Sequence, residues 1–163
     1  MARNDLKDKV VLIAGGGKNL GGLLARNLAK KGAAKIAIHY NSDSSRTDAE
    51  ATLADVQAAG AEGFLFQGDL IQVGHITRFF DETKSRFGGI DIAINTVGKV
   101  LKKPYADTTE AEYDSMADIN AKVAYFFIQV AGKKLNDNGK ISTIVTSLLA
   151  AYTGLYSTYA GQK

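Results

Sequence analysis

The sequence contains no cysteine and no tryptophan, a single proline, and only two histidines, His39 and His75. Without cysteine, a disulfide framework and a thiolate metal site are excluded, and two imidazoles are few ligands for any other metal centre. We therefore expect no metal site. Long apolar runs are also missing, and the charged N-terminal segment MARNDLKDK lacks the apolar stretch of a secretion signal. These absences predict a cytoplasmic protein with no membrane contact.

The composition is that of an ordinary globular protein. Of the 163 residues, 45% are hydrophobic and 23% are charged, which suits one domain spanning 1–163. The 20 basic residues are scattered among 17 acidic ones and do not form a block. Because nucleic-acid binding usually needs a concentrated basic face, we expect no nucleic-acid partner.

Short apolar segments alternate with helical patterns along the chain. Five runs are expected to form strands: 9–13, 35–40, 62–67, 90–95 and 140–146. Apolar residues at helical spacing fall between them, and the longest such stretch extends from about residue 109 to 136. This alternation predicts right-handed βαβ units and an α/β fold, a doubly wound parallel sheet with helices on both faces.

The segment from Val10 to Leu28 joins an apolar strand to a helix through clustered glycines. In such a unit, backbone N–H groups and the positive end of the helix dipole converge just past the strand, where they stabilise a phosphate. A glycine cluster also makes an ordinary connecting turn. A nucleotide is nevertheless the first ligand that this segment suggests.

Three short motifs extend this interpretation. Residues 14–21 (AGGGKNLG) follow the pattern T-G-x-x-x-G-x-G with two departures, residues 95–98 (NTVG) match N-N-A-G at the first and last positions, and residues 159–163 (YAGQK) match Y-x-x-x-K. With these motifs, the whole chain resembles the short-chain dehydrogenase/reductase family. The resemblance implies a Rossmann-like domain, a nicotinamide cofactor and hydride transfer.

The glycine turn departs from the family pattern at Ala14, which replaces threonine, and at Asn19, which replaces the middle glycine. Asparagine is the non-glycine residue that best tolerates left-handed backbone angles, so we expect Asn19 to adopt them. The resemblance implies that the cofactor contacts this turn. It assigns to cofactor binding Gly15, Lys18, Asn19, Leu20 and Gly21.

Cofactor preference can be argued from charge. An acidic residue at the end of the second strand pairs with a ribose 2′-hydroxyl and repels a 2′-phosphate. Here the strand ends in His39, Tyr40 and Asn41, and Arg46 follows. By resemblance, a basic residue at the position of Lys18 favours NADP. We expect NADP (NADPH) as cofactor, with Asn41 and Arg46 beside it; alternatively, Lys18 and Arg46 are ordinary surface charges.

The resemblance also implies cofactor contacts after the third and fourth strands. Asp69, followed by Leu70, stands where the family's aspartate hydrogen-bonds toward adenine, although an aspartate after a strand is also a common helix N-cap. Both interpretations stay open. In the same cofactor region, Asn95 is expected to brace the sheet, and Gly98 to let the backbone approach the cofactor.

One amide interrupts an apolar stripe in the long helical stretch. Asn120 shares this stripe with Met116, Val123, Phe127 and Val130. A buried amide needs partners, and the pattern alone favours a satisfied core amide or a helix kink. By resemblance, Asn120 is instead the catalytic asparagine, which holds a water in the proton path to the active-site lysine.

Tyr159 and Lys163 are spaced to lie one turn apart on one face of a helix. A nearby cation stabilises a phenolate and so assists proton transfer from the phenol. The family also has a hydroxyl thirteen residues before this tyrosine, a spacing that selects Thr146, whereas residue type favours the adjacent Ser147. Alternatively, both hydroxyls only satisfy backbone groups at a strand end.

Together these features predict an NADP-dependent oxidoreductase that moves hydride between nicotinamide and a small carbonyl or secondary alcohol compound. The competing interpretation is a non-catalytic nucleotide-binding or interaction module. The family normally continues past the tyrosine helix with two more strands, so the resemblance also implies a chain that is incomplete at its C-terminus. In its full-length form we expect a homo-oligomer.

Overall fold

The computed structural model describes residues 6–163. The interpretation of the charged N-terminal segment falls largely on residues 1–5, which lie outside the described residues. Five parallel strands form one sheet in the order β3-β2-β1-β4-β5. They are β1 (Val10–Ala14), β2 (Lys35–Tyr40), β3 (Glu62–Gln67), β4 (Ile92–Asn95) and β5 (Lys140–Thr143). The predicted doubly wound parallel sheet is therefore confirmed.

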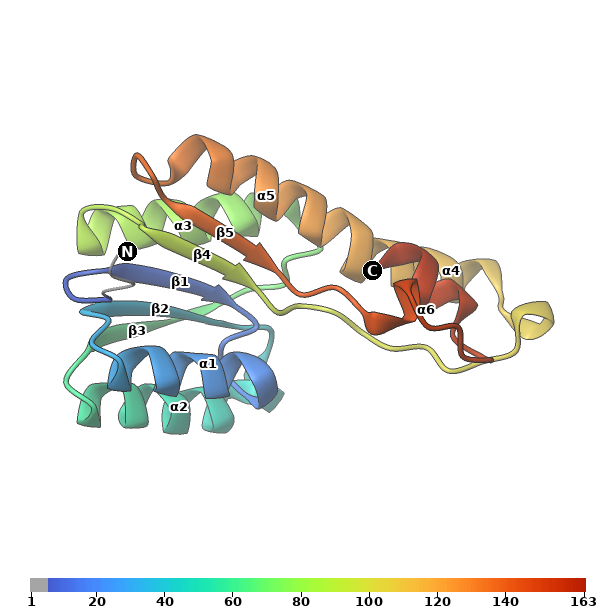
Figure 1. Ribbon diagram of the computed structural model, residues 1–163, viewed down its shortest axis with the longest axis horizontal. Coiled ribbons are helices and arrows are strands. Elements are labelled where there is room, and N and C mark those ends of the chain that lie inside the picture. The colour runs from blue at the N-terminus through green and yellow to red at the C-terminus, as the bar shows by residue number, and fades with distance from the viewer. Residues whose placement is uncertain (1–5) are drawn as a thin grey trace.

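Helices cover both faces of this sheet (Figure 1). One face carries α1 (Asn19–Lys30) and α2 (Arg46–Ala58), and the other carries α3 (Val73–Phe87) and α5 (Val123–Lys134). Two shorter helices, α4 (Glu110–Met116) and α6 (Ser157–Gln162), lie beyond the carboxyl ends of the strands. Within residues 6–163, no helix is long and apolar enough to cross a membrane.

The central strand β1 shows why its sequence is continuously apolar. Val11 and Ile13 pack with residues of α1 and α2 in one hydrophobic cluster, whereas Val10 and Leu12 pack in a second cluster with residues of α3 and α5. A parallel strand covered on both faces needs apolar side chains at successive positions, not at alternating ones. This two-sided burial fixes the strand from which the glycine turn emerges.

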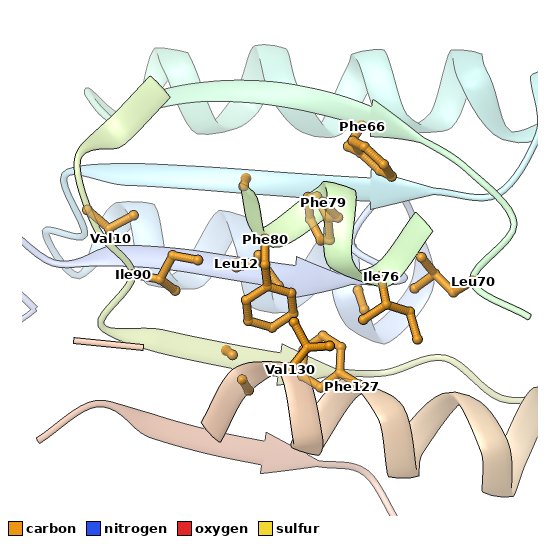
Figure 2. Packing of buried hydrophobic residues seen from close by; sticks show 14 of the residues in the cluster. Val10, Leu12, Phe66, Leu70, Ile76, Phe79, Phe80, Ile90, Phe127 and Val130 are labelled. Carbon is orange, nitrogen blue, oxygen red and sulfur yellow. The ribbon is translucent and has the colours of Figure 1, made fainter. Parts of the chain in front are cut away.

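The larger cluster lies between the sheet, α3 and α5 (Figure 2). Phe79 stacks on Phe66 with 4.8 Å between ring centroids, and Phe80 meets Phe127 edge to face at 5.2 Å. Both geometries are favourable for aromatic pairs. The buried side chains of α3 and α5 therefore face the same core.

Several elements differ from the sequence-based prediction, and the predicted strand 9–13 is shifted by one residue to Val10–Ala14. The predicted strand 140–146 ends at Thr143, because its partner β4 ends at Asn95 and the ladder between them ends there. The predicted strand 90–95 begins at Ile92. The helical stretch predicted for 109–136 is interrupted by a π-helical segment, Ala117–Lys122, that joins α4 to α5.

Candidate functional site

The strand order reverses between β1 and β4, because successive connections from these two strands run toward opposite edges of the sheet. In open α/β sheets, ligands bind outside the carboxyl ends of the strands at this switch point. A cavity of about 300 Å³ lies there. Its walls come from the glycine turn, the end of β2 and the segment after β4, and they comprise Gly15, Gly17, Lys18, Asn19, Leu20, Gly21, His39, Tyr40, Asn41, Ser45, Leu70, Thr96, Val97, Gly98 and Ile119.

The glycine turn is closely packed against itself and against β4. Gly15 has φ +74°, and Asn19 has φ +49°, so the expected left-handed conformation of Asn19 is confirmed. A Cβ on Gly21 would lie 2.1 Å from the Gly15 carbonyl oxygen, which is a steric clash, so the position requires glycine. The Thr96 hydroxyl donates to the carbonyl of Ala14 at 2.9 Å and so ties the turn to the segment after β4.

The first turn of α1 faces the cavity through Lys18, Asn19, Leu20 and Gly21. Among residues 6–163, no side chain caps the N-terminus of this helix. Its backbone N–H groups and the positive end of its dipole are therefore available to an anion. The closely packed glycines and the uncapped helix fit the pyrophosphate of a dinucleotide.

The imidazole of His39 connects two turns beside the cavity. Its Nδ1 lies 3.0 Å from the Gly15 backbone nitrogen, which donates to it, and its Nε2 lies 2.7 Å from the Gly68 carbonyl oxygen. Burial lowers the pKa of His39 to about 4, so the ring is neutral near pH 7. The sequence pattern gave no role to this histidine, although its place at the end of a buried strand was visible.

The charged residues around the end of β2 are paired. Lys18 lines the cavity, and its ammonium lies 3.5 Å from the carboxylate of Asp48. Arg46 does not line the cavity; its guanidinium pairs with Asp43 at 2.9 Å and donates to Gln67 at 3.0 Å. This guanidinium lowers the pKa of Asp43. Lys18 is thus the basic side chain that borders the cavity.

Asp69 does not cap a helix, so the N-cap interpretation is wrong. The following helix α3 begins at Val73 with Gln72 as its N-cap residue. The Asp69 carboxylate accepts instead from the Ile71 backbone nitrogen at 3.0 Å, and this closes the turn after β3. Asp69 itself does not line the cavity, whereas the next residue, Leu70, does.

Asn95 lies at the end of β4 and is almost completely buried, with 1% of its surface exposed. Its side-chain oxygen accepts from the Val97 backbone nitrogen at 3.0 Å. This contact fixes the start of the loop that carries Gly98. Asn95 does not line the cavity.

Lys163 and Asn120 meet at Gly98. The Lys163 ammonium donates to the Val97 carbonyl at 2.8 Å. A Cβ on Gly98 would lie 2.5 Å from the Lys163 nitrogen and 2.9 Å from the Asn120 side-chain oxygen. Partial burial lowers the pKa of Lys163. The structure therefore brings together three predicted site residues that come from the segment after β4, the π-helical segment and the C-cap of α6.

Asn120 is buried in the π-helical segment, where its side-chain oxygen and nitrogen are both hydrogen-bonded. Its side-chain oxygen accepts from the Lys99 backbone nitrogen, and its side-chain nitrogen donates to the Lys99 carbonyl, both at 3.0 Å. π-Helical turns are frequent at functional sites. The satisfied core amide expected from the pattern alone is therefore present, and it anchors the loop after Gly98.

The remaining predicted catalytic residues are Tyr159, Thr146 and Ser147. Tyr159 is half-buried on α6, one helical turn before Lys163. The Thr146 hydroxyl accepts from the Leu148 backbone nitrogen at 3.3 Å and begins a short 3-10 turn, while Ser147 is exposed. None of the predicted catalytic residues, Asn120, Thr146, Ser147, Tyr159 and Lys163, contributes to the cavity wall itself.

Several cavity residues were not singled out from the sequence. They are Gly17, His39, Tyr40, Ser45, Thr96, Val97 and Ile119. Thr96 and Val97 directly follow the carboxyl end of β4, where the parallel-sheet prediction already places ligand contacts, and His39 and Tyr40 are the last residues of β2. That signal would have found Thr96 and Val97, but not Ile119, which comes from the π-helical segment.

Comparisons with known proteins agree with this geometry. A family model described as enoyl-(acyl carrier protein) reductase matches residues 15–163. The chain belongs to the short-chain dehydrogenase/reductase family. A hydroxynaphthalene reductase-like protein, Arp2, from Metarhizium brunneum is 31% identical over 160 residues. That alignment covers 97% of this chain and 58% of the relative, so the chain spans little more than half the length of this reductase-like protein.

Solved structures of the same family are closely similar. A Burkholderia cenocepacia dehydrogenase with bound NADP superimposes with a TM-score of 0.96 at 58% identity, covering 100% of this chain and 62% of that one. A short-chain dehydrogenase from Oenococcus oeni gives a TM-score of 0.79 at 50% identity, covering 95% and 69%. The predicted family resemblance is thereby confirmed.

Proposed function

We propose that this chain is the cofactor-binding part of an NADP-dependent oxidoreductase that moves hydride between nicotinamide and a small carbonyl or secondary alcohol compound. The observation that carries the proposal is the meeting of Lys163 and Asn120 at Gly98, on the wall of the switch-point cavity. This arrangement joins the glycine turn to the Y-x-x-x-K motif. The NADP-bound structure of the similar Burkholderia dehydrogenase supports the choice of cofactor.

The fit of a dinucleotide rests on the glycine turn and its neighbours. Gly15 and Gly21 leave room where a Cβ would clash, and the uncapped first turn of α1 presents N–H groups to the pyrophosphate. Leu70 and Ile119 supply apolar wall for the flat rings. Under this proposal, Asp69 and Asn95 act through the turns that they brace.

When bound, the nicotinamide supplies or accepts the hydride at C4. In the reductive direction, the Tyr159 hydroxyl donates a proton to the carbonyl oxygen that becomes the alcohol. The Lys163 ammonium, one helical turn away, stabilises the phenolate that remains. Thr146 or Ser147 donates a hydrogen bond that orients the carbonyl, and Asn120 holds a water that returns the proton from solvent toward Lys163.

The preference for NADP rests on the charge around the end of β2. The cavity wall there consists of His39, Tyr40, Asn41 and Ser45, which include no carboxylate to repel a 2′-phosphate. Lys18 borders the same wall and supplies the cation. We expect Lys18→Ala to raise the KM for NADPH about tenfold while leaving the KM for NADH within a factor of two.

The decisive experiment measures NADPH consumption by the full-length protein with a panel of ketones and aldehydes. Tyr159→Phe should lower kcat by about 10²-fold or more, because the proton donor is lost, while the Kd for NADPH stays nearly unchanged. Retained turnover in this variant would contradict the role of Tyr159. Tight NADPH binding with no turnover of any carbonyl by the wild type would favour the non-catalytic module.

The proposal includes a full-length homo-oligomer. The outer surface of α5 exposes Tyr125 and Ile128, with 64% and 45% of their surfaces accessible. Exposed large apolar side chains on one helix are typical of contact surfaces. Light scattering on the full-length protein should give a mass above that of one chain; a monomer would contradict this part of the proposal.

A further inference from the structure

Both histidines of the chain hold the turn that follows β3. The Nε2 of His39 contacts the Gly68 carbonyl at 2.7 Å, and the Nδ1 of His75 contacts the next carbonyl, that of Asp69, at 3.0 Å. His39 also reaches the glycine turn, because its Nδ1 accepts from the Gly15 nitrogen at 3.0 Å. His39 therefore spans two turns that are far apart in sequence.

The partners of His39 fix its protonation state. A backbone N–H can only donate, so the nitrogen facing Gly15 must be the unprotonated one. A backbone carbonyl can only accept, so the nitrogen facing Gly68 must carry the hydrogen. One form of the ring meets both demands, the neutral tautomer with hydrogen on Nε2. A protonated ring would turn an N–H toward the Gly15 N–H and break that contact.

The surroundings hold the ring in this orientation. His39 is 3% exposed, and its ring lies against Phe66 and Phe79, with centroid distances of 6.3 and 5.8 Å. Two titratable groups act on it from the packed elements: Asp69, which raises the pKa of His39, and His75, which lowers it. Burial outweighs both and lowers that pKa to about 4.

We propose that His39 is a positioning residue for cofactor binding, whose neutral ring sets the separation between the glycine turn and the turn at Gly68 and Asp69. The inference rests on the proposed function, because these two turns are the ones assigned to the pyrophosphate and the adenosine part of the nucleotide. His39 lines the cavity between them. Its loss therefore weakens cofactor binding before it affects the chemical step at Tyr159.

Three substitutions separate the two hydrogen bonds. His39→Asn keeps an acceptor near the place of Nδ1, His39→Gln keeps a donor near the place of Nε2, and His39→Leu removes both. In the full-length protein, we expect His39→Leu to raise the Kd for NADP⁺ and the KM for NADPH about tenfold or more, with kcat at saturating cofactor within a factor of three. The Asn and Gln variants should fall between this variant and the wild type.

Thr83→Val is the matched control for a general loss of stability. The Thr83 hydroxyl is also buried and also bonds a backbone carbonyl, that of Phe79 at 2.7 Å, but it lies within α3 and does not line the cavity. Thermal unfolding is measured for both variants. If His39→Leu binds NADP⁺ as tightly as the wild type, or no more weakly than Thr83→Val, His39 is only structural and the inference is overturned.

The pH profile supplies a second readout that a merely structural residue would not change. Wild-type affinity for NADP⁺ should fall as the pH decreases toward 4, where His39 becomes protonated. In His39→Asn this fall should be smaller, because an amide does not titrate in this range. Identical profiles in the two proteins would overturn the inference.

The binding measurements also distinguish the two proposals. A wild-type protein that binds NADP⁺ but reduces no carbonyl contradicts the proposed oxidoreductase activity, while the His39 variants still decide the present inference. A wild-type protein that binds neither NADP⁺ nor NAD⁺ overturns both.

Discussion

The strands β1 and β5 belong to one parallel sheet, and both are rich in β-branched residues, yet their surroundings differ. In β1, Val10 is 7% exposed and the other four residues are completely buried. In β5, Ile141 is 39% exposed, and its neighbours Lys140 and Ser142 are also exposed. Within residues 6–163, β5 pairs only with β4. The glycine turn therefore follows the most buried strand, whereas the segment that leads to Tyr159 follows the least buried strand.

The segments that follow these two strands differ in the same way. The glycine turn is surrounded by Gly21, Thr96 and His39, which leave it little freedom. Beyond β5, Val145 and Leu149 are more than half exposed, and α6 is held by single contacts such as Lys163 to Val97 and Gln162 to Tyr113. Packing thus fixes the cofactor side of the site, while a few hydrogen bonds fix the catalytic side.

The largest expected difference comes from truncating one apolar side chain in each strand. Leu12→Ala should lower the free energy of unfolding by about 4 kcal/mol, because it leaves a cavity in a completely buried position. Ile141→Ala should lower the free energy of unfolding by about 1 kcal/mol, because this side chain is already partly exposed to solvent. Urea unfolding followed by circular dichroism measures both. Equal losses would mean that further chain covers β5 in the protein as it folds.

A second comparison uses two glycines. Gly21→Ala places a Cβ against the Gly15 carbonyl, so it should lower the free energy of unfolding by about 3 kcal/mol and abolish nucleotide binding. Gly132→Ala, within α5, meets nothing within 4 Å and should raise stability by about 0.5–1 kcal/mol. Thermal unfolding and NADP⁺ titration measure both effects. A tolerated Gly21→Ala would show that the turn is looser than its packing indicates.

The third prediction concerns stability in acid near the glycine turn. Burial lowers the pKa of His39 from 6.5 to about 4, so the unfolded chain takes up a proton first as the pH falls. The contribution of the neutral His39 ring to the free energy of unfolding is fully present above pH 6.5. The free energy of unfolding should decrease by about 2–3 kcal/mol between pH 6.5 and pH 4 as this contribution is lost. Urea unfolding of the wild type and His39→Asn isolates this contribution. Parallel pH dependences in the two proteins would contradict it.

The smallest effect is expected at the exposed end of the molecule. The Lys103 ammonium donates to both carboxylate oxygens of Glu112 at 2.8 Å, and with the Thr109 cap it lowers the pKa of Glu112 to about 2. This contribution to stability is present above pH 4.5 and is lost as the pH falls toward 2. In Lys103→Met, the free energy of unfolding should depend slightly less on pH between 4.5 and 2, and salt should reduce this difference from the wild type. An unchanged acid profile would show that the pair contributes nothing.

Much of the cofactor side could be predicted from local sequence. The strand, glycine turn and helix are adjacent in the chain, so the pattern at Val10 to Leu28 already contains their contacts. Asn19 takes a left-handed conformation because glycine is absent there and the turn still requires that backbone shape. The alternation of strands and helices predicts ligand contacts at the carboxyl ends of a parallel sheet, whereas the position of the switch point depends on the strand order, which the fold shows.

Two features were missed for different reasons, the first because it depends on a partner far away in the sequence and the second because a residue type allows more than one local contact. The end of β5 is set by the length of β4, which the run at 140–146 does not contain. Asp69 has the residue type of an N-cap, but its carboxylate closes the turn after β3 and α3 begins later. The Thr146 hydroxyl accepts from the Leu148 nitrogen, which agrees with the alternative in which this hydroxyl satisfies a backbone group after the strand.

By itself, the sequence determined the parallel sheet, the glycine turn and the family, because these depend on periodicity and on residues close together in the chain. The tertiary structure alone decided that the neutral ring of His39 links the glycine turn to the Gly68 turn, and that Lys163 meets Asn120 at Gly98. Both contacts join segments that only the packed sheet brings together. Such contacts form where burial leaves a polar group with one available partner, and no local pattern records that partner.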